Sequence, residues 1–96
     1  MKAYLDFNWL GLATCEGSAS IRSQLDVKVV VRLQQLTDSG WSTIKTWTAT
    51  DAGSAYASGV YAVHSGYTYR VSVTGYVYDD NGNLLETGST SDTFVY

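Results

Sequence analysis

The stretch Gly66–Tyr78 constrains the fold more than any other part of the chain. Its sequence, GYTYRVSVTGYVY, alternates large apolar residues with polar ones at a period of two. Tyr69, Val71 and Val73 share one parity, which means that they occupy alternate positions along the stretch, and the residues between them are polar. Since successive side chains of a β-strand point to opposite faces, this pattern predicts a long strand with one face in a core.

Six further segments read as strands, with turn-forming residues between them. Short strands at regular spacing, without helical periodicity, are typical of a sandwich. The expected strands are Tyr4–Leu10, Ala13–Ser23, Val27–Leu36, Trp41–Thr50, Ala55–His64, Tyr67–Tyr78 and Asn83–Val95. A chain of 96 residues forms one core. We therefore predict an all-β fold, a seven-stranded antiparallel β-sandwich that forms a single domain over residues 1–96.

The parity of each strand predicts which side chains face the core. In the first strand we expect Leu5, Phe7 and Trp9 to point inward. The parity of Trp41–Thr50 stays open, because its two tryptophans fall on one side and Ile44 falls on the other.

The parity of Ala55–His64 stays open as well. The expected anchors of this strand are Val60, Tyr61 and Val63, and Gly59 is expected to mark a bulge.

Two hairpin turns set the register of their strands. Thr37–Gly40 fits a type I turn that a left-handed glycine closes with a bulge. For Asp79–Gly82 we favour a type I turn plus bulge over a two-residue loop, because it places Val77 opposite Leu85. It also places Arg70 opposite Asp92, so that opposite charges meet.

The segment Ser65-Gly66-Tyr67-Thr68-Tyr69-Arg70-Val71 resembles the turn into strand F of fibronectin type III and other immunoglobulin-like sandwiches. The resemblance implies that Tyr69 is a buried corner tyrosine whose hydroxyl forms a hydrogen bond with the main chain near Val63–Ser65. Together with Val31–Gln34, Ser39–Trp41 and Lys45–Trp47, this segment is similar to a group of small secreted proteins of Gram-positive bacteria of unknown function. That resemblance implies an immunoglobulin-like, fibronectin III-like sandwich and transfers no catalytic or ligand residue. The absence of proline departs from fibronectin modules.

Charge and composition exclude several classes of partner. The net charge is −3, and the six Lys and Arg residues are scattered, so nucleic acid is not an expected partner. No stretch approaches the roughly 20 apolar residues of a membrane span, so membrane insertion is not expected. A charged fraction of 16% beside 14% aromatic residues is typical of extracellular β-proteins. We expect a secreted or surface-displayed protein whose signal peptide has been removed.

Candidate catalytic residues are few. Cys15 is expected to be a small core residue, and a nucleophile would need a partner such as His64. The carboxylates of Glu86 and Asp92 are expected to be solvated rather than to act as an acid and a base. The chain carries no common catalytic motif. We predict no enzymatic activity and no cofactor.

One loop has the residue spacing of a metal site. Asp79–Asn83 places oxygen ligands two residues apart, which hints at calcium, but its glycine comes early and strands flank it. A plain turn is the favoured interpretation, and no metal ligand is predicted.

Two functional hypotheses remain. The first is a structural or interaction module that binds a protein partner or another copy of itself, through a sheet face or through the first and last strands. The second is a carbohydrate-binding module that uses exposed aromatic rings. On the outward parity of Tyr67–Tyr78 and Val27–Leu36, we predict an interaction patch formed by Tyr76, Tyr78 and Arg32.

Overall fold

The computed structural model describes all residues, 1–96, and consists of seven β-strands. No helix is present. The strands are β1 (Lys2–Phe7), β2 (Leu12–Ser20), β3 (Asp26–Thr37), β4 (Gly40–Ala52), β5 (Ser54–Ala62), β6 (Thr68–Tyr78) and β7 (Leu84–Val95). The predicted all-β fold with seven strands is confirmed.

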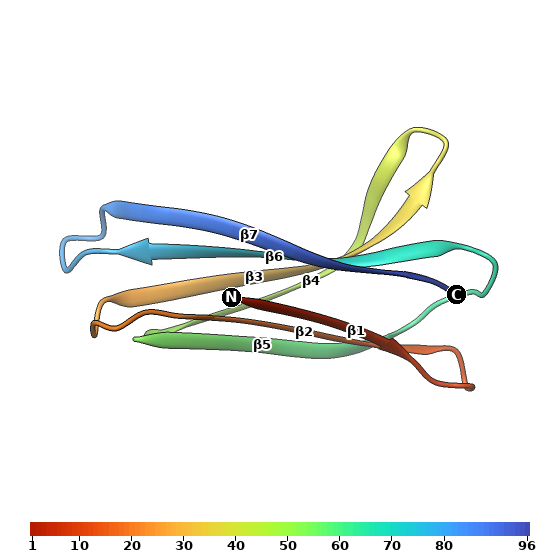
Figure 1. Cartoon of the computed structure of the whole chain (residues 1–96), viewed down its shortest axis with the longest axis horizontal. Coiled ribbons are helices and arrows are strands. Elements are labelled where there is room, and N and C mark those ends of the chain that lie inside the picture. The colour runs from red at the N-terminus through yellow and green to blue at the C-terminus, as the bar shows by residue number, and fades with distance from the viewer.

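The strands form two antiparallel sheets that lie face to face (Figure 1). One sheet has three strands in the order β1-β2-β5, and the other has four in the order β4-β3-β6-β7. All pairings within the sheets are antiparallel, and β3 pairs with β6 over ten residue pairs from Asp26↔Tyr78 to Gln35↔Tyr69. The two most strongly alternating stretches of the sequence are therefore neighbours at the centre of the larger sheet.

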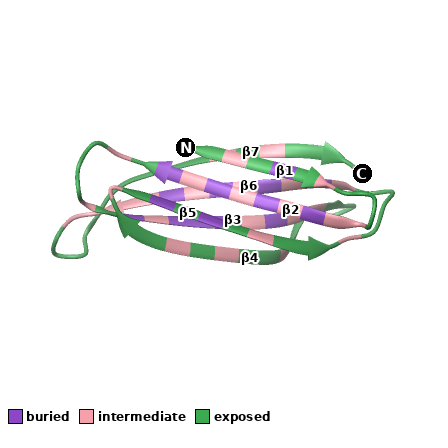
Figure 2. Cartoon of the chain, turned by 90° about the horizontal axis from the view of Figure 1, so that it is seen from below, coloured by how far each residue is buried: buried purple, intermediate pink, exposed green.

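The core lies between the sheets and follows the alternation of the sequence. Figure 2 shows buried residues at every second position of β2 and β6, whereas the outer strands β4 and β7 carry none. The buried cluster is Leu5, Ala13, Cys15, Ala19, Val27, Val29, Val31, Leu33, Ala55, Ala57, Tyr69, Val71 and Val73. Cys15 is fully buried among apolar neighbours, as its parity predicts.

The first strand is shorter than expected, and the prediction that Trp9 points inward is wrong. β1 ends at Phe7, and Trp9 is 91% exposed. The side chain of Asn8 causes this end, because its Oδ1 accepts hydrogen bonds from the backbone N–H groups of Leu10 (2.9 Å) and Leu12 (3.1 Å). Asn8 thus folds the chain into a turn, and Trp9 lies in that turn.

A bulge resolves the parity of β4. Leu33 pairs with Lys45, but the next residue, Gln34, pairs with Thr43, so Ile44 is an extra residue. The extra residue reverses the faces of the strand on its two sides. Trp47 therefore packs against the core, whereas Trp41 points to the outer face.

The glycine of the β3–β4 hairpin has the positive φ that the predicted turn requires. Gly40 has a φ of 110°.

The expectations for β5 are wrong at three positions. The register of β2 with β5 runs without interruption past Gly59, so no bulge is present. Gly59 instead leaves room for the indole of Trp47, which a Cβ at this position would overlap. Val60 is 57% and Tyr61 38% exposed, and the strand is anchored by Ala55 and Ala57.

The predicted register of β6 with β7 is also wrong. Val77 pairs with Glu86 and Arg70 pairs with Thr93, and Leu85 is skipped between Glu86 and Leu84. The bulge therefore lies within β7 and not in the turn.

The side chain of Asp79 organises that turn. It accepts backbone hydrogen bonds from Asn81 (2.9 Å) and Asn83 (2.8 Å). These bonds lengthen the loop to Asp79–Asn83. The turn predicted from the sequence, Asp79–Gly82, did not take these side-chain hydrogen bonds into account.

The observed register turns Asp92 toward the other sheet. Its Oδ2 accepts a hydrogen bond of 3.0 Å from the backbone N–H of Leu5. Leu5 belongs to β1, an edge strand of the three-stranded sheet, and Asp92 belongs to β7, an edge strand of the four-stranded sheet. The bond therefore joins the two sheets along one side of the sandwich.

Tyr69 is 1% exposed, and its hydroxyl donates a 2.7 Å hydrogen bond to the carbonyl oxygen of His64. This is the bond to upstream main chain that the corner-tyrosine resemblance implies. Around Tyr69, the rings of Phe7 (5.7 Å between centroids) and Tyr67 (6.4 Å) close one end of the sandwich. Tyr96 stacks on Phe7 at 4.4 Å.

Candidate functional site

Tyr76 and Tyr78 lie on the outer face of the four-stranded sheet, as their parity predicts. Tyr76 is opposite Lys28 and Tyr78 is opposite Asp26 on β3. The two rings stack with centroids 6.4 Å apart at an angle of 25°. Both side chains are half-buried, so part of each ring faces solvent.

The structure brings Lys28 to this pair rather than Arg32. The Nζ atom of Lys28 lies 5.9 Å from the ring centroid of Tyr76, which is cation–π geometry. Arg32 is on the same face but pairs with Ser72, four residues further along β3, or about 13 Å. We call Tyr76, Tyr78 and Lys28 the tyrosine cluster.

A second cation–aromatic cluster, which the sequence did not predict, lies at the other end of the same face. The guanidinium carbon of Arg70 lies 4.3 Å from the ring centroid of Trp41. Arg70 Nε also donates a 2.7 Å hydrogen bond to Oε1 of Gln34, and Gln34 Nε2 donates to Oγ1 of Thr43 at 3.0 Å. We call Trp41, Arg70 and Gln34 the tryptophan cluster.

Parity placed Arg70 and Gln34 outward, but the position of Trp41 depends on the Ile44 bulge, for which the sequence gives no signal.

Hydroxyl groups fill the rest of this face. Many of the residues on the outward parity of β4, β6 and β7 are Ser or Thr, among them Thr43, Thr46, Thr48, Thr50, Ser72, Thr74, Thr87, Ser89, Ser91 and Thr93. Arg32 lies among them, between the two clusters. Three of the six Lys and Arg residues of the chain, Lys28, Arg32 and Arg70, are therefore on one face of a protein whose net charge is −3.

The candidate nucleophile and its partner do not meet. Cys15 lies inside the core, and burial raises the pKa of its thiol to about 12. His64 is exposed in the connection between β5 and β6. A thiol with this pKa holds its proton at neutral pH, and the thiolate is the reactive form.

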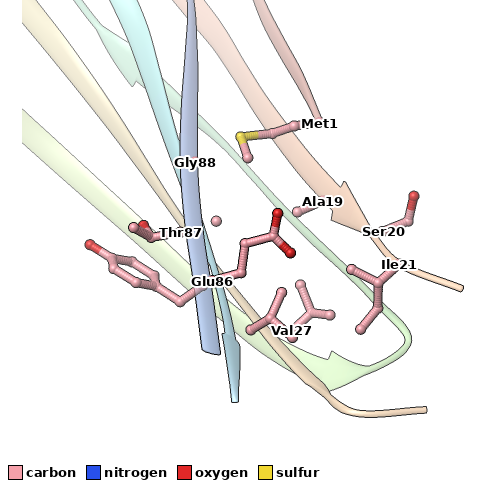
Figure 3. Close-up of a pocket in the computed structure, with 11 residues that line it drawn as sticks. Met1, Ala19, Ser20, Ile21, Val27, Glu86, Thr87 and Gly88 are labelled. Carbon is pink, nitrogen blue, oxygen red and sulfur yellow. The ribbon is translucent and has the colours of Figure 1, made fainter. Parts of the chain in front are cut away.

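The candidate carboxylates do not form an acid–base pair. Glu86 and Asp92 are six residues apart on β7, or about 20 Å. Asp92 accepts the hydrogen bond from Leu5, and Glu86 lines a cleft of about 150 Å³ between the end of β2 and the start of β7 (Figure 3). Met1 covers part of this cleft, where Gly75 and Gly88 leave room for its side chain. Glu86 is the one carboxylate among the lining residues.

The loop that resembled a calcium site is a turn. The carboxylate of Asp79 accepts its hydrogen bonds from Asn81 and Asn83, and those from Asn83 contribute most to lowering its pKa. Gly82 takes a φ of 83° to complete the turn. No group of three or more His, Cys, Asp or Glu side chains converges in the molecule.

Comparison of the chain with models of protein families, with curated proteins and with solved structures finds no match. Among the elements of the fold there is no helix with the length and hydropathy that a membrane crossing requires.

Proposed function

We propose that the protein is a non-enzymatic interaction module that binds a protein partner through the outer face of its four-stranded sheet. One observation carries this proposal: the face presents two cation–aromatic clusters, Lys28 with Tyr76 and Arg70 with Trp41. Tyr, Trp and Arg are the residues that contribute most to binding energy at protein interfaces. Both clusters are ordered by contacts within the sheet, so binding orders few additional side chains.

The size and charge of the face define the partner. Along β3 the clusters extend from Asp26, opposite Tyr78, to Leu36, opposite Trp41, which is about 33 Å, and four strands span about 14 Å, so the face covers roughly 460 Å². Such an area is smaller than the roughly 800 Å² per partner of a stable interface, so we expect weak, reversible binding. Since the face carries three cations, Lys28, Arg32 and Arg70, against the one carboxylate of Asp26, the surface that it binds is acidic.

The order of the strands supports the immunoglobulin-like, fibronectin III-like interpretation of the fold. In constant-type immunoglobulin domains the fourth strand belongs to the sheet of the first two strands. Here β4 pairs with β3 in the other sheet, as in fibronectin type III modules. The Tyr69 hydrogen bond to His64 supports the same assignment. The relation to small secreted Gram-positive proteins and the secreted or surface location stay predictions, supported by the low charged fraction of 16%.

The proposed interface is tested with the double variant Tyr76→Ser, Tyr78→Ser. Self-association is measured by sedimentation velocity over a concentration series. Binding of an acidic surface is measured by ¹H–¹⁵N NMR titration with poly-glutamate, which reports the amides of Lys28, Arg32 and Arg70. We expect the double variant to lose the interaction and to keep a thermal midpoint near that of the unmodified protein, because both rings are half-exposed.

The control is the double variant Tyr4→Ser, Tyr56→Ser on the opposite face, which we expect to associate normally. A protein that stays monomeric and shows no perturbation of these three amides would contradict the proposal. A loss of stability in the Tyr76, Tyr78 variant would show that the two rings serve the fold.

A further inference from the structure

A second candidate site lies on the outer face of the three-stranded sheet, on the side opposite the two clusters. It is a shallow trough of about 250 Å³ lined by Lys2, Tyr4, Glu16, Gly17, Ser18 and Tyr56. These residues form two adjacent rows across the sheet. Tyr4 of β1 pairs with Glu16 of β2 in one row. Lys2, Ser18 and Tyr56 form the next, through the pairs Lys2↔Ser18 and Ser18↔Tyr56.

Two tyrosine rings wall the trough, and β2 provides its floor. Tyr4 is 47% and Tyr56 56% exposed. They belong to the two strands that flank β2, so their strands are roughly 10 Å apart. Gly17, whose neighbours across the core are Val31 and Val73, adds no side chain to the trough.

A hydrogen bond fixes the orientation of two polar groups in the trough. The hydroxyl of Tyr56 donates a 2.7 Å hydrogen bond to Oε1 of Glu16. That bond positions both the ring and the carboxylate, and it is the main cause of the raised pKa of Tyr56. The second oxygen of Glu16 remains an acceptor, the amine of Lys2 is a donor, and the hydroxyl of Ser18 is both.

These groups select the class of ligand. The lining carries one cation, Lys2, and one carboxylate, Glu16, so its two charges balance and give neither an anion nor an organic cation a net attraction. A quaternary ammonium group is bound by a cage of several rings around one point, and this trough has only two rings. A neutral sugar fits each feature, because its C–H face packs on a tyrosine ring while its hydroxyls donate to Glu16 and accept from Lys2.

We propose that this trough binds one hexose unit of a neutral polysaccharide. A volume of about 250 Å³ is below the 300 to 1,000 Å³ of sites for drug-sized ligands, so one sugar ring fills it. The open trough leaves both ends of that ring free for continuation of the polymer along the sheet. The site is separate from the proposed protein interface and does not depend on it.

The test measures retention of the protein on neutral polymers by affinity gel electrophoresis. The gels contain hydroxyethyl cellulose, laminarin, mannan or soluble starch, with polygalacturonate as the acidic comparison. We expect retardation by at least one neutral polymer. Tyr4→Ser and Tyr56→Ser weaken the apparent affinity about tenfold or more, as loss of an aromatic anchor does. Glu16→Gln weakens it while preserving the shape of the trough.

Two controls separate binding from folding and from the other face. Tyr56→Phe keeps the ring and removes only its hydrogen bond to Glu16, so it should bind more strongly than Tyr56→Ser at an equal thermal midpoint. Tyr76→Ser, Tyr78→Ser should be retarded like the unmodified protein. The proposal is overturned if no neutral polymer retards the protein, if only polygalacturonate does, or if the trough variants bind unchanged.

Discussion

Single residues show where parity suffices to predict a position and where it does not. Cys15 and Tyr69 are buried as predicted, because each lies within an uninterrupted run of alternating residues. Trp9 is exposed because the side chain of Asn8, which directly follows the half-buried Phe7, accepts two backbone hydrogen bonds and ends the strand. A local side-chain bond of this kind competes with strand pairing and is invisible to a hydrophobic pattern.

Burial of Cys15 predicts a pH dependence of stability. In the unfolded chain the thiol titrates near its ordinary pKa of 9.0, and in the folded protein near 12. Between these values the folded protein holds a proton that the unfolded chain has released. The stabilisation is therefore complete below pH 9 and declines as the pH rises toward 12, by up to about 1.4 kcal/mol per pH unit.

The measurement is the free energy of unfolding in urea between pH 8 and pH 11. Cys15→Ala is the control, because it removes this thiol and leaves the tyrosines that titrate in the same range. We expect the decline to be shallower in the variant. Parallel curves for the two proteins would refute the assignment.

At the scale of elements, the existence of all seven strands was predictable, but two registers were not. Each of the bulges, at Ile44 in β4 and at Leu85 in β7, adds one residue without a glycine or proline to mark it. One extra residue reverses the faces of a strand. That is why Tyr76 and Tyr78 were placed correctly on the unbroken β6, whereas Trp41 was missed.

The packing of β4 on β5 depends on Gly59 and Trp47. A Cβ at position 59 would overlap the indole of Trp47. We expect Gly59→Ala to destabilise the protein by about 1 to 3 kcal/mol, the range for overpacking. The measurement is the free energy of unfolding in urea.

A double-mutant cycle isolates the cause. In a Trp47→Leu background, Gly59→Ala should cost little or should stabilise, because alanine is entropically favoured over glycine in a strand. Equal losses in both backgrounds would mean that the ring is not the obstacle.

At the scale of the whole molecule, the two-sheet arrangement was predictable, but the join between its edges was not. The molecule is only 16 Å thick, whereas it is 45 Å long. Its four-stranded sheet extends beyond the core, and β4 and β7 bury no residue fully. The predicted register had Asp92 facing Arg70 outside, whereas it bonds Leu5 across the sheets. The Asp92 carboxylate already accepts the backbone N–H of Leu5 at the edge of β1. A further strand could not use this N–H for pairing, so the bond disfavours strand addition at this position.

This bond predicts the effect of Asp92→Ala. Loss of a charged acceptor leaves the Leu5 N–H without its partner, and we expect a loss of about 1.5 to 3 kcal/mol in the free energy of unfolding. Ser91→Ala, at the neighbouring outward position, should change stability by less than about 0.5 kcal/mol. Equal effects of the two substitutions would contradict the role of the bond.

The contacts between β1 and β7 also determine how the fold bears load. Met1 lies at Gly88, Leu5 bonds Asp92, and the hydroxyl of Tyr96 donates to the carbonyl oxygen of Asn8 at 3.1 Å. The two terminal strands therefore run parallel to each other, one in each sheet. Tension applied between the chain ends pulls these strands along their length in opposite directions, so the contacts share the load and yield together.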